Sequence, residues 1–411
     1  MTAEEQTGEI INDSVYIRNT AVEDRYNIKI CKTPAGSDAF KAQLPKMINS
    51  NTADFDVALY RMADMVSYVG NGYFRNIFDL EYTDFTKPWW EKESINYLSL
   101  DHKLFGIHSA ITLVDKMGAQ ALVFNKDILQ NYSLETPYQS VSDGTWTIDK
   151  LGEMTKQVSK DLNGDGKMDT EDLWGLFYQR DTLSNFVNGC GVFMAQKNAE
   201  DYLEMTFAGE RQYAVYEKIF DVLYDDKSAI NAHKDMGDDW AAKQDAMFQQ
   251  NQGLFMWIRM RDCEALRSME TDFGIVPPPK YDVKQDRYYV SINPYTTTIL
   301  GIPVSNTDME KTGIILEALA AESLYTVQPA YYDITLQGKV TRDVESEQML
   351  DIIYGNLCYD IGDMFCLGGL EQYVWLTMTK SREIASYYEK REGKCLNDIE
   401  KIMAKIAELN Q

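Results

Sequence analysis

The chain has 411 residues, of which 45% are hydrophobic and 12% aromatic, and its formal net charge is −24. This composition indicates a folded protein, and the length exceeds one comfortable hydrophobic core, which predicts two domains or three. The acidic balance argues against nucleic acid as a partner, because no basic face is left to displace counterions from phosphate. It favours a neutral or cationic ligand.

The sequence contains no run of eighteen apolar residues and no apolar signal region at its start, so no membrane-spanning segment is predicted. Either a leader was removed before the chain begins or the protein is cytoplasmic. The six cysteines form no CxxC pair and are expected to be free thiols. The three histidines have no spacing typical of a zinc site.

The first part of the chain has helical and strand-like patterns in turn. Apolar residues at helical spacing predict a helix at about 8–27, followed by a strand at 28–32. A buried strand of the parallel type is predicted at 54–60. Because ligands bind beyond the carboxyl ends of such strands, Tyr60 and Arg61 are candidate binding residues. An ordinary strand-to-helix loop is an equally good interpretation of this pair.

A buried strand and two helix starts are predicted in the stretch before residue 151. The run at 119–124, AQALVF, is too short for a core helix and lacks polar alternation, so it predicts a strand buried on both faces. Asn125 is predicted to cap the helix that follows this strand. Thr147 is predicted to cap a second, amphipathic helix.

An acidic loop at 161–172, with the sequence DLNGDGKMDTED, has the spacing of an EF-hand calcium site. Gly166 fills the sixth place, where the loop turns sharply. The predicted oxygen donors are the side chains of Asp161, Asn163, Asp165, Asp169 and Asp172 and the carbonyl group of Lys167. A single loop predicts a structural Ca²⁺ rather than a sensor, and Asp172 in place of the usual glutamate predicts weaker binding. The alternative is a solvated acidic turn without metal.

The order of segments from residue 103 to residue 151 resembles a known family. KLFGI, ALVFNKDIL, PY and GTWTIDKL follow one another here as at the lobe crossover of the extracellular solute-binding proteins of family 1. These are the sugar-type receptors of ABC importers, related to maltose-binding protein. The likeness continues through QGLFMWIRM at 252–260 and FGIVPPPK at 273–280, over nearly the whole chain. The alternative is that the chain is any α/β enzyme with a buried strand and a capped helix, and not a receptor of this family.

The resemblance implies an α/β fold of two lobes, the type II periplasmic-binding-protein fold, with a hinge between the lobes. It places residues 1–112 and 277–325 in the first lobe, and residues 113–276 and 326–411, with the acidic loop, in the second. In this family a β-strand normally precedes the first helix. That strand has no counterpart here, so the sheet of the first lobe is expected to be incomplete.

The resemblance also implies candidate ligand-binding residues, each with a structural alternative. Trp89 and Trp90 lie in a segment similar to the family's approach to the cleft, although paired tryptophans more often pack in a core. The segment 184–193 resembles a loop that faces the cleft, and the end of the strand at 252–260 reaches the ligand in this family. The candidates from these two segments are Asn185, Asn188, Phe193, Trp257 and Arg259. For the last two, a buried tryptophan and a surface arginine are equally good interpretations.

The function that the resemblance implies is capture of a carbohydrate, such as an oligosaccharide, and its delivery to the transmembrane subunits of an ABC permease. The implied receptor is a monomer at the extracellular face of the cytoplasmic membrane, held by a lipidated cysteine upstream of Met1. No phosphate loop, nucleophile elbow or catalytic metal spacing is found. A secreted, calcium-stabilised glycoside hydrolase is the alternative, because the acidic residues are numerous enough to include a catalytic pair. A calcium-dependent adhesion module would need repeated loops.

Overall fold

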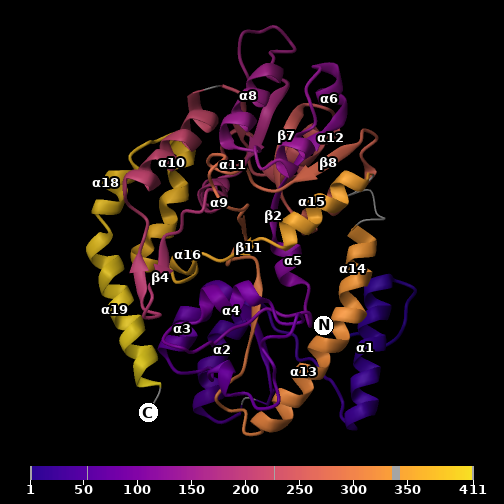
Figure 1. The fold of residues 1–411 in the computed structure, drawn as a ribbon, viewed down its shortest axis with the longest axis vertical. Helices are drawn as coiled ribbons and strands as arrows, with labels where there is room; N and C mark the ends of the chain where they lie inside the picture. The colour runs from indigo at the N-terminus through magenta and orange to yellow at the C-terminus, as the bar shows by residue number, and fades with distance from the viewer. Residues whose placement is uncertain (1, 53, 226, 336–342, 410–411) are drawn as a thin grey trace.

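The computed structural model describes residues 2–52, 54–225, 227–335 and 343–409. These residues form two lobes, each built around a β-sheet with helices packed against it (Figure 1). The larger sheet belongs to the second lobe and has the strand order β6-β3-β7-β2-β8. Its strands are β2 (Gln120–Asn125), β3 (Trp174–Tyr178), β6 (Ala229–Asn231), β7 (Gly253–Arg259) and β8 (Phe273–Val276).

Strand β2 lies inside the larger sheet, as AQALVF predicts. All six of its residues are buried, and it pairs antiparallel with both β7 and β8. Asn125 caps the following helix, α6 (Lys126–Asn131), by accepting a hydrogen bond from the Ile128 N–H at 3.0 Å. Thr147 caps α8 (Ile148–Val158) in the same way through the Lys150 N–H, so both predicted caps are confirmed.

Several helices pack against strands of the larger sheet. Besides α6 and α8 they are α7 (Pro137–Ser142), α12 (Trp240–Gln249) and α15 (Val344–Tyr354). Helices α9 (Thr182–Gly189), α10 (Glu210–Phe220) and α11 (Ala232–Asp235) complete this part of the second lobe. The sheet interior is apolar, which places the core of the lobe between strands and helices.

The first lobe has a small sheet, in which β1 (Ala58–Arg61) pairs antiparallel with β10 (Thr298–Gly301). Strand β1 is therefore shorter than the predicted strand at 54–60, and its pairing is not parallel. Around it lie α1 (Ile10–Tyr26), α2 (Ser37–Asn49), α3 (Met65–Gly70), α4 (Lys92–Leu98) and α13 (Met309–Tyr325).

The predicted strand at 28–32 does not form. Within the described ranges no neighbouring strand pairs with this segment, and the Ile30 N–H donates instead to Glu23 Oε1 at 2.8 Å. A strand needs a partner for its backbone groups, so apolar residues in a row do not suffice to form one. Among the described residues the sheet of the first lobe has two strands, and the missing first strand stays a prediction.

The chain crosses between the lobes at α5 (Val114–Gly118) and again near β9 (Val290–Ser291), which pairs in parallel with β11 (Leu357–Cys358). The second crossing comes later than the predicted boundary at residue 277. Lys280 keeps its backbone on the second lobe, because its N–H donates to Trp146 O at 3.0 Å and its carbonyl accepts from the Ile148 N–H at 2.9 Å.

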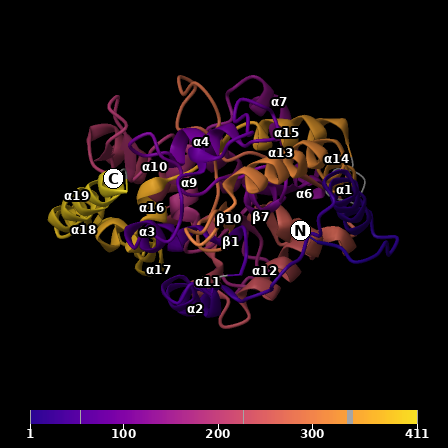
Figure 2. The same ribbon diagram turned by 90° about the horizontal axis from the view of Figure 1, so that it is seen from below.

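Helix α14 (Val327–Thr335) was predicted to belong to the second lobe but lies in the first. It packs beside α1 and α13 of the first lobe, as Figure 2 shows from below. The last helices, α18 (Ile384–Glu389) and α19 (Glu392–Glu408), run along one side of the molecule (Figure 1). In the described part of the chain, no helix combines the length and apolar character needed to cross a membrane.

Candidate functional site

An ion-pair group lies at the carboxyl end of β1 in the first lobe. Arg61 Nε is 3.0 Å from Asp64 Oδ2, and Lys41 Nζ is 2.5 Å from Asp64 Oδ1. Asp64 is 2% exposed, so its carboxylate is buried with two cations beside it, which offsets the cost of removing its charge from water. Arg61 keeps part of its surface exposed at the end of the strand, where the sequence predicted a binding residue.

The return crossing and the C-terminal segment contribute Tyr295 and Cys366. Tyr295 OH lies 3.2 Å from Cys366 Sγ, and α16 (Ile361–Met364) packs against the turn Met62–Asp64 of the first lobe. Burial raises the pKa of Tyr295, and burial raises the pKa of the Cys366 thiol to about 11. Tyr295 nevertheless remains 41% exposed.

Three acidic residues of the C-terminal segment, Asp360, Asp363 and Glu371, form no ion pair with any of the described residues. Burial, and then the charges of Asp360, Glu371 and Asp181, raise the pKa of Asp363 well above its ordinary value. Asp360 is held by the Met194 N–H at 2.8 Å and the Asn188 Nδ2 at 3.1 Å. Glu371 Oε2 is buried without a hydrogen-bond donor among the described residues, although Oε1 accepts from a neighbouring amide.

The second lobe contributes an exposed indole and a guanidinium group. Arg180 follows the carboxyl end of β3, and its guanidinium carbon lies 4.4 Å from the ring centre of Trp375. Arg180 Nε donates to Asp181 Oδ1 at 2.7 Å, which fixes the orientation of the guanidinium group. Trp375 is 49% exposed. An exposed aromatic face beside fixed polar groups suits a ligand with apolar faces and hydroxyl groups.

We call this set of residues the lobe junction. It joins residues of both lobes, because α16 packs against the turn Met62–Asp64 of the first lobe, and the neighbouring segment Leu367–Trp375 packs against α9 of the second. Its members are Lys41, Arg61, Asp64, Arg180, Asp181, Tyr295, Asp363, Cys366, Glu371 and Trp375. Of these the sequence predicted only Arg61. Tyr295 stands in the polar-aromatic segment NPYTTT at residues 293–298. This composition is the one local sequence signal near the members of the lobe junction that were not predicted.

Three predicted aromatic residues pack inside the first lobe. Tyr60 is 1% exposed, and its hydroxyl donates to Phe105 O at 2.9 Å. Trp89 Nε1 and Trp90 Nε1 donate to the two carboxylate oxygens of Glu317, at 3.1 and 2.9 Å. These contacts match the structural alternative given for Trp89 and Trp90, whereas Tyr60 lies inside β1 rather than in a strand-to-helix loop. The ligand roles of all three stay predictions.

Two predicted residues of the second lobe share one buried partner, the side-chain oxygen of Gln120. Trp257 Nε1 and Asn185 Nδ2 both donate to it at 3.1 Å, and the two side chains are 2% and 6% exposed. Asn185 also accepts a hydrogen bond from the Ser291 hydroxyl at 2.9 Å. Asn185 therefore ties the second lobe to the crossing strand β9.

The remaining predicted residues lie at separate places. Asn188 binds Asp360, as described above, and Phe193 is buried with its ring 5.6 Å from that of Tyr97. Arg259 is partly exposed and forms an ion pair with Asp262 at 2.5 Å. The structure therefore does not bring the nine predicted ligand residues together, and Arg61 alone lies in the lobe junction.

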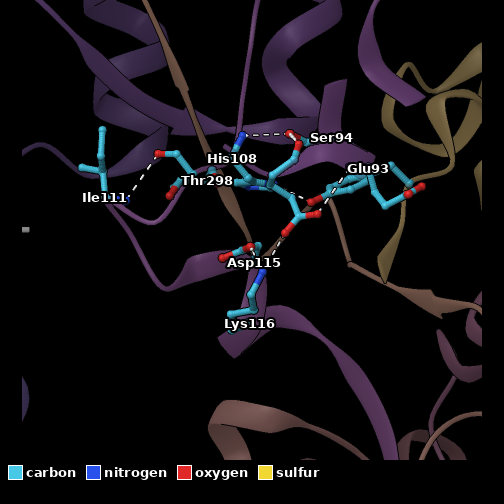
Figure 3. Close-up of polar contacts among 10 residues, drawn as sticks. Glu93, Ser94, His108, Ile111, Asp115, Lys116 and Thr298 are labelled. Carbon is cyan, nitrogen blue, oxygen red and sulfur yellow. Dashed lines mark hydrogen bonds and ion pairs between the residues drawn. The ribbon is translucent and has the colours of Figure 1, made fainter. Parts of the chain in front are cut away.

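A buried ion-pair group holds the first crossing (Figure 3). Lys116 Nζ in α5 lies 2.6 Å from Asp115 Oδ2 and 2.7 Å from Glu91 Oε2 of the first lobe. Burial works to lower the pKa of Lys116, but the charges of Asp115 and Glu91 outweigh it and raise that pKa. Lys116 is therefore charged, and it ties the crossing helix to the first lobe.

His108 links the first lobe to the segment after β11. Its Nε2 lies 2.8 Å from Thr298 O and its Nδ1 lies 2.9 Å from Tyr359 OH. A carbonyl oxygen only accepts, so Nε2 carries the proton and Nδ1 accepts from the tyrosine. Burial lowers the pKa of His108, which favours this neutral form. Figure 3 shows His108 near Ser94, whose hydroxyl accepts the His108 N–H at 3.2 Å.

The acidic loop at 161–172 folds around its own backbone. Asp161 accepts hydrogen bonds from the Gly164 and Gly166 N–H groups at 2.6 and 2.9 Å, and both glycines have positive φ. Asp172 is fully buried and accepts from the Leu162 and Asp169 N–H groups. The predicted metal ligands of this loop are carboxylate, amide and carbonyl oxygens. These are the hard ligands that Ca²⁺ prefers, so their chemistry fits the ion. In the described residues, however, no three acidic, histidine or cysteine side chains are arranged as a metal site.

The arrangement of two lobes with chain crossings between them defines the fold class of the protein. It is the fold of the type II solute-binding proteins, as the resemblance implied. No protein-family model matches the chain, and no curated protein matches it by sequence. The comparison therefore rests on solved structures.

Three solved structures match nearly the full length. UspC of M. tuberculosis has a TM-score of 0.65 at 14% identity, covering 93% of this chain and 96% of that one. A cyclo/maltodextrin-binding protein complexed with maltotetraose has a TM-score of 0.63 at 10% identity, covering 98% and 95%. The ABC substrate-binding protein Lmo0181 from Listeria monocytogenes, in complex with cycloalternan, has a TM-score of 0.59 at 12% identity, covering 95% and 96%. This likeness confirms the two-lobed fold.

Proposed function

We propose that the protein is a solute-binding receptor that captures a carbohydrate at the lobe junction and does not transform it. The observation that carries the proposal is the exposed indole of Trp375 beside the guanidinium group of Arg180, which follows the carboxyl end of β3. Aromatic faces stack on the apolar faces of sugars, and fixed polar groups bind hydroxyls. Ligands of open α/β sheets bind beyond the carboxyl ends of strands.

The structural neighbours support a carbohydrate as the ligand. Two of them were solved with bound oligosaccharides, maltotetraose and cycloalternan. A ligand that touches both lobes stabilises their closed arrangement, since it binds that arrangement more tightly than the open one.

The remaining parts of the proposal follow from the receptor role. A receptor of this kind is a monomer that delivers its solute to the transmembrane subunits of an ABC permease at the outer face of the cytoplasmic membrane. The lipid anchor stays a prediction. We also propose that the loop at 161–172 holds a structural Ca²⁺ through Asp161, Asn163, Asp165, Asp169, Asp172 and the Lys167 carbonyl.

A thermal melt against a panel of mono- and oligosaccharides tests the receptor role. A sugar that binds only the folded protein stabilises it by about 2.7 kcal/mol at a hundredfold excess over its dissociation constant. We expect one class of sugar to raise the midpoint and to be recovered unaltered. Recovery of cleaved sugar would establish the glycoside hydrolase instead, and a flat response to every sugar would contradict a carbohydrate ligand.

A further inference from the structure

A cavity of about 530 Å³ lies beside β6, the edge strand of the larger sheet. It is lined by Ile230 of β6, by Trp174 at the start of β3, and by residues of the acidic loop, of α11 and of the turn that follows α17 (Leu376–Thr379). Cavities of this size hold small molecules. None of the residues that line it is a member of the lobe junction, so it is a separate candidate site.

Three lysines line this cavity. Lys227 precedes β6, Lys234 lies in α11, and Lys380 follows α17. All three are exposed, so a dissolved ligand can reach them. Among the residues that the structure describes, their ammonium groups have no ion-pair partner, whereas Lys116 and Lys218 are paired with carboxylates. Three like charges around one cavity repel one another, and a bound anion relieves that repulsion.

Two of these lysines have a backbone conformation that residues with a side chain seldom adopt. The φ angle is +49° at Lys227 and +52° at Lys380. Lys380 ends α17 in this left-handed conformation, at a position where helices most often have glycine. Strained residues of this kind cluster at ligand sites. The strain at Lys227 and Lys380 therefore places a positive charge at the cavity at a cost to the fold.

Two aspartates also line the cavity and reduce its positive charge. Asp235 Oδ2 accepts the Asn231 N–H at 3.2 Å, and Asp169 Oδ1 accepts the Glu171 N–H at 2.9 Å. Neither carboxylate forms an ion pair with the three lysines in the described part of the chain. Three ammonium groups and two carboxylates leave the wall positive, although the whole chain carries a net charge of −24. The attraction for an anion is therefore local to this cavity.

The side chains of the wall indicate the kind of anion. Arginine suits planar carboxylates, which it binds with two parallel hydrogen bonds, whereas lysine binds phosphate as a point charge. The cations of this wall are lysines. Met168, Trp174 and Ile230 supply an apolar part, and the Trp174 Nε1 group is already committed to Asp169 O at 2.7 Å. A ligand with a phosphate group and an organic part matches both halves of the wall.

We infer that this cavity binds a small organic phosphate, with the phosphate group among Lys227, Lys234 and Lys380 and the organic part against Trp174. The inference does not depend on carbohydrate capture at the lobe junction. It assigns the protein a second binding site, for an anion, in the second lobe.

Titration calorimetry on the full-length protein tests the inference. The probes are glucose 6-phosphate, glycerol 3-phosphate and AMP, each beside its neutral counterpart, glucose, glycerol or adenosine. The buffer is freed of divalent cations, so that phosphate cannot bind through a calcium ion in the neighbouring loop. We expect at least one phosphate to bind at least about tenfold more tightly than its neutral counterpart, and less tightly as salt is added. Equal affinities in every pair, or no binding of any phosphate, would overturn the inference.

Substitutions assign the binding to the lysines. Lys227→Gly combined with Lys380→Gly removes two charges and suits the left-handed backbone, so it should raise the melting midpoint and weaken phosphate binding at least about tenfold. Adding Lys234→Gln should abolish binding, whereas Lys284→Gln, at an exposed lysine elsewhere, should leave it unchanged.

A further variant separates this cavity from the lobe junction. Trp375→Ala should keep the phosphate affinity of the wild type, because Trp375 does not line the cavity. Phosphate binding that survives the triple lysine substitution, or that is lost in Trp375→Ala, would place the anion elsewhere and overturn the inference. The triple variant should bind neutral sugars as the wild type does, so failure of this inference leaves the receptor role standing.

Discussion

Lys116 Nζ lies 2.7 Å from Glu91 Oε2, and this ion pair joins the helix of the first crossing to the first lobe. The pair is buried, and Asp115 completes it from the same helix. Its position at a crossing means that the geometry of the first crossing depends on one lysine. Breaking it leaves two carboxylates in the interior without a cation.

Lys116→Met should therefore lower the free energy of unfolding strongly. Removal of one partner of a buried pair costs about 3–5 kcal/mol, because the remaining charge stays uncompensated. Chemical denaturation measured by circular dichroism checks this value. Lys284→Met, which removes an exposed lysine, is the control and should change stability by less than about 0.5 kcal/mol. Equal stabilities of the two variants would mean that Lys116 is not needed for the fold.

Trp375→Ala should weaken carbohydrate binding without loss of stability. The ring is 49% exposed, so its removal costs little folding energy, but a central aromatic contact of a binding site contributes enough for at least a tenfold effect. Titration calorimetry with the sugar found in the melt measures the affinity. Trp375→Phe retains an aromatic face and should bind with intermediate affinity. Wild-type affinity in Trp375→Ala would remove this residue from the site.

Asp245 should make the protein less stable as pH rises from about 4 to above 6. Burial, and then the charge of Asp262, raise the pKa of Asp245 to about 6, so the folded state holds its proton more tightly than the unfolded state does. Stability is highest where the carboxyl group is protonated in both states and falls as pH passes the folded pKa. Asp245→Asn removes this dependence.

At pH 7.5 we expect Asp245→Asn to be more stable than the wild type by about 1 kcal/mol, because solvent partly reaches the group and reduces the full effect. The difference should vanish at pH 4. Denaturant titrations at the two pH values give both numbers. A difference that is the same at both pH values would contradict the assignment to Asp245.

The predicted caps and the central strand β2 could be derived from the sequence because each depends on neighbours in the chain. Asn125 and Thr147 cap helices that begin directly after them. The segment 28–32 failed as a strand because a strand needs a partner elsewhere. Likewise, Tyr60 and Trp375 are both aromatic, and only the packing of distant segments decides that the first is buried and the second exposed.

The site was harder to predict than the fold for the same reason. Arg61 follows from the rule that ligands lie beyond the ends of strands. Arg180 and Trp375 are far apart in the sequence, and their contact arises only when the C-terminal segment returns to the end of β3. Asp363 and Glu371 carry no local signal in a chain with 64 acidic residues.

Calcium should stabilise the loop at 161–172 if it binds there. Trp174 Nε1 donates to Asp169 O in the loop at 2.7 Å, so its fluorescence should report binding. We expect Ca²⁺ to raise the melting midpoint, and we expect Asp161→Asn combined with Asp165→Asn to abolish the rise. Trp174→Phe should remove most of the fluorescence change and keep the stabilisation. The same calcium response in the double variant would place the ion elsewhere.

Hydrogen–deuterium exchange with and without the bound sugar tests the central claim most directly. A ligand at the lobe junction should slow exchange in segments from both lobes at once, namely 61–64, 180–182 and 363–375. Peptides on the outer surface, such as 161–172, should be unchanged. Protection confined to one lobe, or found only outside these three segments, would contradict binding between the lobes.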